Sequence, residues 1–321
     1  MLDSYGRIID YLRISVTDRC NMRCVYCMPE DGIPKLDHCD ILTYDEIIRT
    51  VRIMSGTGIR KIKITGGEPL VRKGVTGLIG ELKSIPGIEQ VTITTNGTLL
   101  EENLEALVRA GVDGINVSID SLDQKNYAAV TRKDLLADAL RGLGAALEAG
   151  LNVKINCVPV SPDEDILALA ELARDNPLQV RFIEIMPLGE GKRFPLRSED
   201  ELTELLVSRF GPVLSAGPVA GNGPAKYVTF EGFRGNIGFI SAISHKFCSS
   251  CNRLRLTADG YIKTCLQFDT GCFLRPLLRD GSEDGLIRDT IVRAVYEKPR
   301  CHEFAPGGGN GDVRLMSQIG G

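Results

Sequence analysis

The sequence predicts an α/β fold in which a partial (β/α)6 barrel is followed by a smaller α+β domain. Two observations support this prediction. An alternating, strand-like stretch is followed by a helical pattern six times in succession, and a Gly- and Pro-rich stretch at 211–224 then ends the series. Six such units predict a parallel sheet with right-handed crossovers, and they are too few for a closed eight-stranded barrel. The pattern alone leaves a flat, doubly wound sheet open.

The expected elements of the barrel follow one another in order. Alternation predicts strands at 11–17, 61–65, 91–95, 114–120, 153–158 and 180–186. Periodicity predicts helices at 44–54, 75–84, 101–110, 134–149, 163–175 and 199–209. Thr43 is the expected N-cap of the first helix, and Gly56 and Gly58 are expected to end it.

One face of these strands is expected to line a wet cavity. Parallel strands are normally apolar on both faces, yet five successive strands here carry a polar face. Its members are Arg13, Ser15, Lys61, Lys63, Thr65, Thr92, Thr94, Asn116, Ser118, Lys154 and Asn156. The excess of Lys and Arg indicates an anionic ligand and favours an open barrel. The alternative interpretation is that single cations snorkel from the rim of a sheet.

Beyond residue 224 the pattern becomes that of a small α+β domain. Short antiparallel strands are predicted at 226–231, 236–241, 253–257 and 261–265, with a hairpin turn at Asp259-Gly260, and helices at 273–279 and 284–297. The expected division is a barrel over 1–215, a C-terminal domain over 216–305 and a Gly-rich tail over 306–321.

Composition excludes several classes of protein. The net charge of −4 argues against a nucleic-acid-binding platform, and neither a run of eighteen apolar residues nor a signal peptide is found, so we expect a cytoplasmic protein and no membrane. Ten cysteines in a reducing compartment suggest metal binding. Six fall into two groups. The scattered ones, Cys39, Cys157, Cys272 and Cys301, are expected to be small buried hydrophobic residues.

The first cysteine group is Cys20, Cys24 and Cys27, spaced C-x3-C-x2-C. Three close thiolates can hold three irons of a [4Fe–4S] cluster and leave the fourth iron open to a ligand. The aromatic residue Tyr26 before the last cysteine belongs to the same pattern. A zinc knuckle or structural cysteines are the alternatives.

A second motif, Thr65-Gly66-Gly67-Glu68-Pro69, lies at the C-terminal end of the second predicted strand. Strand ends of this kind carry the functional sites of barrels. Its two glycines are expected to let a ligand approach the backbone closely. In isolation the motif would be an ordinary turn between a strand and a helix.

The second cysteine group is Cys248, Cys251 and Cys265, again three thiols without a clear fourth. They are expected to hold a second iron–sulfur cluster with an open iron. His245 could instead complete a Cys3His zinc site. Arg253 and Arg255 follow at once on one strand face, and two guanidinium groups there suit a phosphate or a purine edge.

Together these motifs resemble the GTP 3′,8-cyclase (MoaA) family of radical S-adenosylmethionine (SAM) enzymes, which begins molybdenum-cofactor biosynthesis. The resemblance covers the whole chain. The segments that carry it are 10–20, 65–70, 94–97, 116–120, 181–186, 248–255 and the final Gly320-Gly321. One departure is Lys63, where the family usually has an arginine, which exchanges a bidentate contact for a point charge.

The resemblance implies a radical-SAM type of barrel and an activity. GTP would be converted to (8S)-3′,8-cyclo-7,8-dihydroguanosine 5′-triphosphate, with two [4Fe–4S] clusters and SAM as cofactors. A 5′-deoxyadenosyl radical would abstract the C3′ hydrogen of the ribose, and C3′ would then attack C8 of guanine.

The resemblance also implies roles for single residues. The metal ligands would be Cys20, Cys24, Cys27, Cys248, Cys251 and Cys265, and the SAM contacts Tyr26, Gly67, Ser118 and Met186. The GTP contacts would be Arg13, Lys61, Lys63, Thr94, Lys154, Arg181, Arg253 and Arg255. The catalytic group would be Arg253, Arg255, Gly320 and Gly321.

A terminal diglycine is usually a frayed end. The resemblance implies that Gly320 and Gly321 instead enter the cavity near the arginines. The expected partners are an external one-electron donor and a downstream cyclic pyranopterin monophosphate synthase that receives the product, with no nucleic acid. A homodimer is compatible with the sequence, which does not fix the oligomeric state. The rivals are a peptide-modifying radical-SAM enzyme and a non-enzymatic iron–sulfur or zinc protein.

Overall fold

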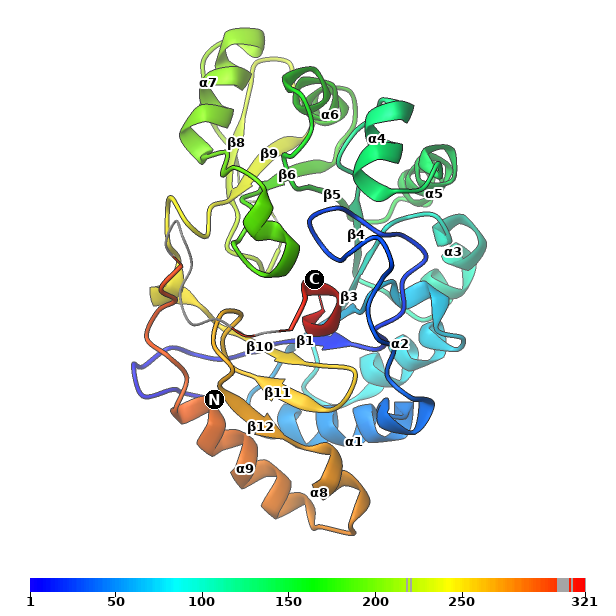
Figure 1. Cartoon of the computed structure of the whole chain (residues 1–321), viewed down its shortest axis with the longest axis vertical. Coiled ribbons are helices and arrows are strands. Elements are labelled where there is room, and N and C mark those ends of the chain that lie inside the picture. The colour runs from blue at the N-terminus through cyan, green and yellow to red at the C-terminus, as the bar shows by residue number, and fades with distance from the viewer. Residues whose placement is uncertain (218, 220, 305–311, 313, 321) are drawn as a thin grey trace.

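An arc of parallel strands, with helices along its outer side, organises the chain (Figure 1). The structure is a computed structural model that describes residues 1–217, 219, 221–304, 312 and 314–320. Its described strands form one twelve-stranded sheet in the order β12-β11-β10-β1-β2-β3-β4-β5-β6-β9-β8-β7. The predicted α/β class and the open barrel are confirmed.

The six predicted units are present. The strands of the barrel are β1 (Tyr11–Ser15), β2 (Lys61–Thr65), β3 (Gln90–Thr95), β4 (Gly114–Ser118), β5 (Val153–Cys157) and β6 (Gln179–Ile183). The helices after them are α1 (Tyr44–Ser55), α2 (Val75–Ser84), α3 (Leu100–Arg109), α4 (Gln124–Thr131) with α5 (Leu136–Glu148), α6 (Asp163–Asp175) and α7 (Glu199–Phe210). Thr43 caps α1 as predicted, because its hydroxyl accepts from the Glu46 N–H and the Glu46 carboxylate accepts from the Thr43 N–H.

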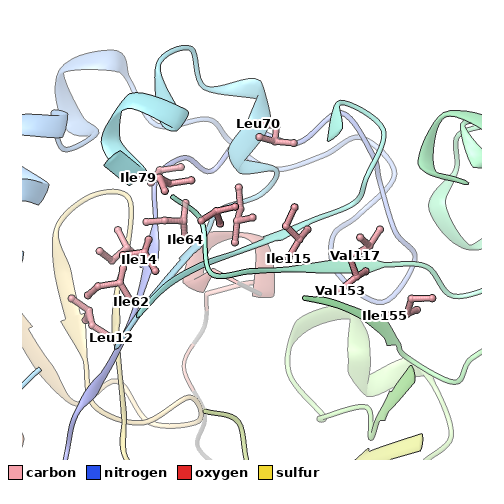
Figure 2. Packing of buried hydrophobic residues seen from close by; sticks show 14 of the residues in the cluster. Leu12, Ile14, Ile62, Ile64, Leu70, Ile79, Ile115, Val117, Val153 and Ile155 are labelled. Atoms are coloured by element: carbon pink, nitrogen blue, oxygen red, sulfur yellow. The ribbon is translucent and has the colours of Figure 1, made fainter. Parts of the chain in front are cut away.

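The register of the sheet separates an apolar face from a polar one, as the alternation predicts. Leu12 pairs with Ile62, and Ile93 with Ile115, so that apolar side chains stand in rows under the helices. Figure 2 shows Leu12, Ile62 and Ile115 of these rows together with Ile79 of α2. On the other face Arg13 is the register partner of both Lys63 and Arg255. Three cations from three strands therefore stand side by side.

The strands beyond residue 224 are β8 (Lys226–Thr229), β9 (Asn236–Ile240), β10 (Arg253–Leu256), β11 (Tyr261–Lys263) and β12 (Gly271–Phe273). The antiparallel pairing predicted for this region is found in β8–β9 and β10–β11. The prediction was wrong in one respect, because β9 also pairs in parallel with β6 and β10 in parallel with β1. These strands therefore extend both edges of the barrel sheet.

Several short elements were not predicted. They are α4, β12, the two-residue β7 (Leu214–Ser215) and α10 (Met316–Ile319). The two helices α8 (Arg275–Arg279) and α9 (Asp284–Tyr296) were predicted to within two residues at each end. The turn at Gly260 is confirmed by its positive φ of 89°. Within the described residues, no helix has the length and apolar character needed to span a membrane.

Candidate active site

The polar face of the sheet lines a cavity of about 300 Å³. Side chains from the strands β1–β6 and from β10 form its wall, and the loop of the first cysteine group lies at its edge. Most of the predicted site residues line it: Arg13, Cys20, Cys24, Tyr26, Cys27, Lys63, Gly67, Thr94, Ser118, Lys154, Arg181, Met186, Arg253 and Arg255. The sheet thus brings together residues that are more than 240 positions apart in the sequence.

The loop with the first three cysteines is held by its neighbours rather than by secondary structure of its own. The Cys27 N–H donates to the Cys24 carbonyl at 2.9 Å. The unpredicted helix α4 supports the loop from outside, since the Val25 N–H donates to the Val130 carbonyl at 2.9 Å. The Arg132 guanidinium donates to the carbonyls of Arg23 and Met28. The role of α4 is therefore to fix this loop.

The three thiols are partly buried in the loop beside the cavity. Burial raises the pKa of Cys20 to about 11 and that of Cys27 to about 12, and it raises the pKa of Cys24 well above its usual range. Buried thiols of this kind become thiolates when a bound metal supplies positive charge. Within the described part of the chain, no three Cys, His, Asp or Glu side chains converge on one point suitable for a single ion. A cluster is held differently, by thiolates at separate irons.

The Gly-Gly-Glu-Pro turn packs directly on the cysteine loop. The Gly67 N–H donates to the Thr17 carbonyl at 2.7 Å, and the Glu68 N–H to the Arg19 carbonyl at 2.9 Å. A Cβ at Gly67 would lie 2.4 Å from the Arg19 carbonyl oxygen. The predicted reason for the glycines, close approach of a ligand, is thus incomplete. They are needed first because the backbone of the cysteine loop occupies the space of a side chain.

Glu68 of this turn ties two strand ends together. Its buried carboxylate accepts hydrogen bonds from the Thr95 hydroxyl and the Asn96 N–H, both at 2.7 Å. Burial raises the pKa of Glu68 to about 7, against the effect of these hydrogen bonds. The residue therefore holds the end of β2 to the end of β3, beneath the cysteine loop.

The four predicted SAM contacts all lie on the wall of the cavity, and one has an acidic partner that the prediction did not include. The Tyr26 hydroxyl donates to Asp120 at 2.7 Å, and the Val158 N–H donates to the same carboxylate at 2.8 Å. Burial raises the pKa of Asp120 to about 6. Asp120 thus joins the cysteine loop to the ends of β4 and β5.

The cations of the wall are buried beside one another. Burial lowers the pKa of Lys63 well below its usual range, and three neighbouring cations add to that effect. Burial also lowers the pKa of Lys154, to about 8, with a further contribution from Arg181. Among the described residues, no carboxylate forms an ion pair with Lys63, Arg181 or Arg255. The wall is therefore arranged for an anion.

Lys61 is a predicted substrate contact that the structure does not bring to the cavity. Its ammonium pairs with Asp10 at 2.8 Å. Lys61 shares a strand face with Lys63 but stands at the beginning of β2. Position along the strand, in addition to the face, decides which cations reach the cavity.

The second cysteine group lies beside the cavity but is not part of its wall. Burial raises the pKa of the Cys251 thiol, but nearby cations, Lys298 and Arg253 foremost, outweigh this and bring it to about 7. Buried Arg7 donates to the carbonyls of Cys248, Pro299 and Arg300 and holds these loops together. Burial instead raises the pKa of Cys248, so the cationic setting favours the thiolate at Cys251.

His245, the alternative zinc ligand, contacts a different residue. Its Nδ1 lies 3.2 Å from the Glu199 carboxylate. Of the four scattered cysteines, Cys157 is buried as predicted, whereas Cys39 and Cys301 are exposed, which corrects the prediction for both. Cys272 is partly buried.

The end of the chain enters the cavity region (Figure 1). Met316 and Ser317 line the cavity, and the Arg255 guanidinium donates to the Gly320 carbonyl at 2.6 Å. Gly320 has a φ of 85°, and a Cβ there would lie 2.8 Å from the Thr65 hydroxyl. Only glycine fits there without strain. The predicted partner Gly321 lies outside the described residues.

Sequence reasoning missed several residues of the wall. They are Tyr11, Asp120, Glu184 and Ser317. Asp120 and Glu184 stand in motifs that were recognised, at the C-terminal ends of β4 and β6, and that position was the available signal. Asn156 lines the cavity as its strand face predicts, but no local pattern reveals that it accepts from the Arg181 guanidinium at 3.0 Å and orients it.

Comparison with known proteins places this geometry in context. A model described as the Radical SAM superfamily matches residues 14–173, and one described as Molybdenum Cofactor Synthesis C matches residues 178–304. The GTP 3′,8-cyclases of Clostridium perfringens (strain 13) and Petrotoga mobilis are 44% identical over 324 residues and 46% identical over 334 residues, and each alignment covers the whole of both chains.

Among solved structures, Streptococcus suis SuiB bound to S-adenosylmethionine is similar in fold. It has a TM-score of 0.62 at 17% identity, over 88% of this chain and 68% of that chain. At this identity the likeness supports the fold alone.

Proposed function

The chain belongs to the GTP 3′,8-cyclase family of the radical SAM superfamily, and on this premise we propose that its cavity holds SAM and GTP together. The family carries out the first step of molybdenum-cofactor biosynthesis. The observation that carries the proposal is a wall with a cysteine loop at one edge and buried, like-charged cations along the strands. The two sets of groups face the same cavity.

Membership of the radical SAM superfamily implies SAM and a [4Fe–4S] cluster. When bound, this pair supplies the primary-carbon radical that starts the reaction. We propose Cys20, Cys24 and Cys27 as the ligands of that cluster, since they are the three thiols on the cavity wall. Their loop is fixed by α4 and by the Gly-Gly-Glu-Pro turn, so it would hold a bound cluster in one position.

Four residues are proposed to hold SAM: Tyr26, Gly67, Ser118 and Met186. They come from the cysteine loop and from the ends of β2, β4 and β6, and all line the cavity. The hydrogen bond from Tyr26 to Asp120 holds the cysteine loop to the end of β4. Such a rigid frame would keep the reactive carbon of SAM at one position relative to the substrate.

The triphosphate is proposed to lie along the cations Arg13, Lys63, Lys154 and Arg181. Each has a pKa lowered by burial, so each gains from a neighbouring anion. Thr94 can donate a hydroxyl hydrogen bond on the same wall. We leave Lys61 out of this set because it pairs with Asp10.

We also propose that Cys248, Cys251 and Cys265 hold a second [4Fe–4S] cluster. Arg253 and Arg255 lie on β10, directly after this group, and both reach the cavity. A guanine base between them and the open iron would place the ribose toward SAM. The arginines, with Gly320 and Gly321, would hold the nucleotide and exclude water while C3′ closes on C8.

The setting of the reaction is also proposed. All ten cysteines are free thiols, which supports a reducing, cytoplasmic compartment. An external one-electron donor would supply the electron, and a cyclic pyranopterin monophosphate synthase would take the product. The division into a barrel over 1–215, a C-terminal domain over 216–305 and a tail over 306–321 stays a prediction.

Metal analysis tests the second cluster. Anaerobically reconstituted protein should contain about eight iron and eight sulfide per chain. Cys248→Ser should lower both by about half while leaving the first cluster. Stoichiometric zinc at the second group would overturn this part of the proposal.

Anaerobic incubation with reductant, SAM and each nucleoside triphosphate in turn tests the function. We expect 5′-deoxyadenosine and a cyclised nucleotide with GTP. Equal turnover of ATP would mean that the guanine contact is wrong. A peptide-modifying enzyme, the rival with a similar fold, would give no cyclised nucleotide at all.

A further inference from the structure

A buried ion pair joins the end of the chain to the hairpin of the second cysteine group. The Lys263 ammonium lies 2.5 Å from the Asp312 carboxylate, and the two side chains are 0% and 1% exposed. The same ammonium donates to the Phe268 carbonyl. Lys263 ends β11, two residues before Cys265.

A second charged contact reinforces this pair. The Arg314 guanidinium lies 3.1 Å from Asp312 and 3.1 Å from Asp269, and it stacks over the Tyr261 ring at 4.5 Å. The Asp312 N–H donates to the Gln267 carbonyl at 2.6 Å. The residues 312 and 314 are thus fixed to the β11–β12 hairpin by side chains and by backbone.

From this anchor the chain runs to the cavity. After Leu315 the chain forms the short helix α10. Gly320, eight residues after Asp312, then accepts a hydrogen bond from the Arg255 guanidinium. On the way the Ser317 N–H comes within hydrogen-bond reach of the Cys27 thiol. The described end of the chain therefore contacts the first cysteine group and an arginine next to the second.

A buried ion pair contributes little net stability, because desolvation of both charges offsets their attraction. It does fix register, since separating either charge from its buried partner leaves an uncompensated buried charge, which is strongly destabilising. A slip of one residue in extended chain would move the following residues by about 3.3 Å. The hydrogen bond from Arg255 to Gly320, 2.6 Å long, would not survive such a shift.

We propose that Lys263 and Asp312 are positioning residues that set the register of the C-terminal residues 314–320, so that Gly320 meets Arg255. The proposal rests on the proposed role of the diglycine in the reaction. It assigns to the hairpin of the second cysteine group a further task, which is to hold the segment that closes the cavity.

The test is the double variant K263M/D312L, which removes both charges and keeps the buried volume close to the original. Protein folding and iron content should be unchanged. Amide hydrogen exchange in residues 314–320 should become roughly tenfold faster or more, because an apolar pair does not penalise a shifted register as the two buried charges do. Turnover should fall by a similar factor, mainly in kcat. The single variant D312N, which leaves Lys263 without its charged partner, should be less stable than the double variant.

The control is K83M/D113N, which removes another close ion pair, 2.5 Å long, between α2 and the start of β4. Its turnover and its exchange in 314–320 should match the wild type. Should K263M/D312L keep both wild-type exchange in this segment and wild-type turnover, the pair is not a positioning device.

Deletion of Gly320 and Gly321 separates this inference from the proposed function. If the deletion abolishes turnover and K263M/D312L leaves turnover and exchange intact, only the role of the ion pair fails. If the truncated enzyme is fully active, the diglycine has no role in the reaction, and the proposed role of the Lys263–Asp312 pair fails with it. If the diglycine and the ion pair both act as proposed, adding K263M/D312L to the truncated enzyme should not lower turnover any further.

Discussion

Lys154 is the residue whose charge should respond most directly to pH. It lies beside Arg181 and over the Tyr227 ring, with its ammonium 5.7 Å from the ring centre. Burial, with a contribution from Arg181, lowers its pKa to about 8. The arginines of the wall stay charged in any ordinary buffer.

GTP binding should therefore weaken as pH rises through 8. Below pH 8 the free protein already carries the Lys154 proton, so binding an anion takes up none. Above pH 8 binding must restore that proton, which lowers affinity by up to about tenfold per pH unit for each such group. Anaerobic titration calorimetry with GTP, without reductant, measures this profile between pH 6.5 and 9.5.

Lys154→Arg is the matched variant for this profile, since a guanidinium keeps its proton. Its affinity should stay within a few-fold of the wild type at pH 7, and the weakening near pH 8 should become smaller. Lys63, whose pKa is also lowered by burial, would account for any weakening of GTP binding with rising pH that this variant still shows. An unchanged profile in Lys154→Arg would remove Lys154 from the triphosphate site.

The arginine pair of β10 gives a second prediction for single residues. Arg253→Ala and Arg255→Ala should each weaken GTP binding by roughly tenfold to a hundredfold, because a charge-assisted hydrogen bond contributes about 1.5–3 kcal/mol. Iron content should stay complete in both. Arg109→Ala, on an exposed helix face, is the control and should bind normally. Normal GTP affinity in both β10 variants would refute the proposed contact.

Among the structural elements, the Gly-Gly-Glu-Pro turn and the cysteine loop behave as one unit. Gly67→Ala would bring a Cβ within 2.4 Å of the Arg19 carbonyl, and backbone cannot yield as a flexible side chain can. We expect this variant to lose about half of its iron, from the first group only. Iron analysis and 5′-deoxyadenosine formation measure the effect.

Gly77→Ala is the control for that change, since a Cβ at this position in α2 meets nothing within 4 Å. It should keep its iron and gain up to about 1 kcal/mol of stability, as alanine favours a helix over glycine. A Gly67→Ala protein with full iron and full activity would show that the close packing is not required.

Local periodicity was sufficient for most elements of the barrel. The predicted bounds of β2, α2 and α6 coincide with the observed ones, because each has a clear apolar repeat and a turn at its ends. The helix α4 was missed because its 8 residues are too few to show a clear helical repeat. The parallel pairing of β1 with β10 was missed because strands about 240 residues apart leave no local trace of their pairing.

The site was predictable to the extent that it follows strand alternation and known motifs. Alternation placed Lys63 and Lys154 on the cavity side, but it could not tell that Lys61 at the beginning of β2 would pair with Asp10. The two glycines were recognised, but their packing on the cysteine loop is a contact between distant segments that the sequence does not show. The Lys263–Asp312 pair joins segments that no sequence motif connects.

At the scale of the whole molecule, the sheet and the end of the chain enclose one reaction space. Deleting Gly320 and Gly321 should leave iron content unchanged and the melting temperature within about 2 °C, because few contacts are lost. Formation of cyclised GTP and 5′-deoxyadenosine should fall greatly, since Arg255 loses its partner in the cavity. Full activity after the deletion would mean that the diglycine has no part in the reaction.

The position of GTP relative to SAM is the central claim, and GTP carrying deuterium at C3′ tests it most directly. The nucleotide is incubated anaerobically with enzyme, SAM and reductant, and both products are examined by mass spectrometry. If the cavity holds the ribose C3′ toward SAM, 5′-deoxyadenosine gains one deuterium and the cyclised nucleotide loses it. Unlabelled 5′-deoxyadenosine beside a cyclised product that keeps its deuterium would contradict the account.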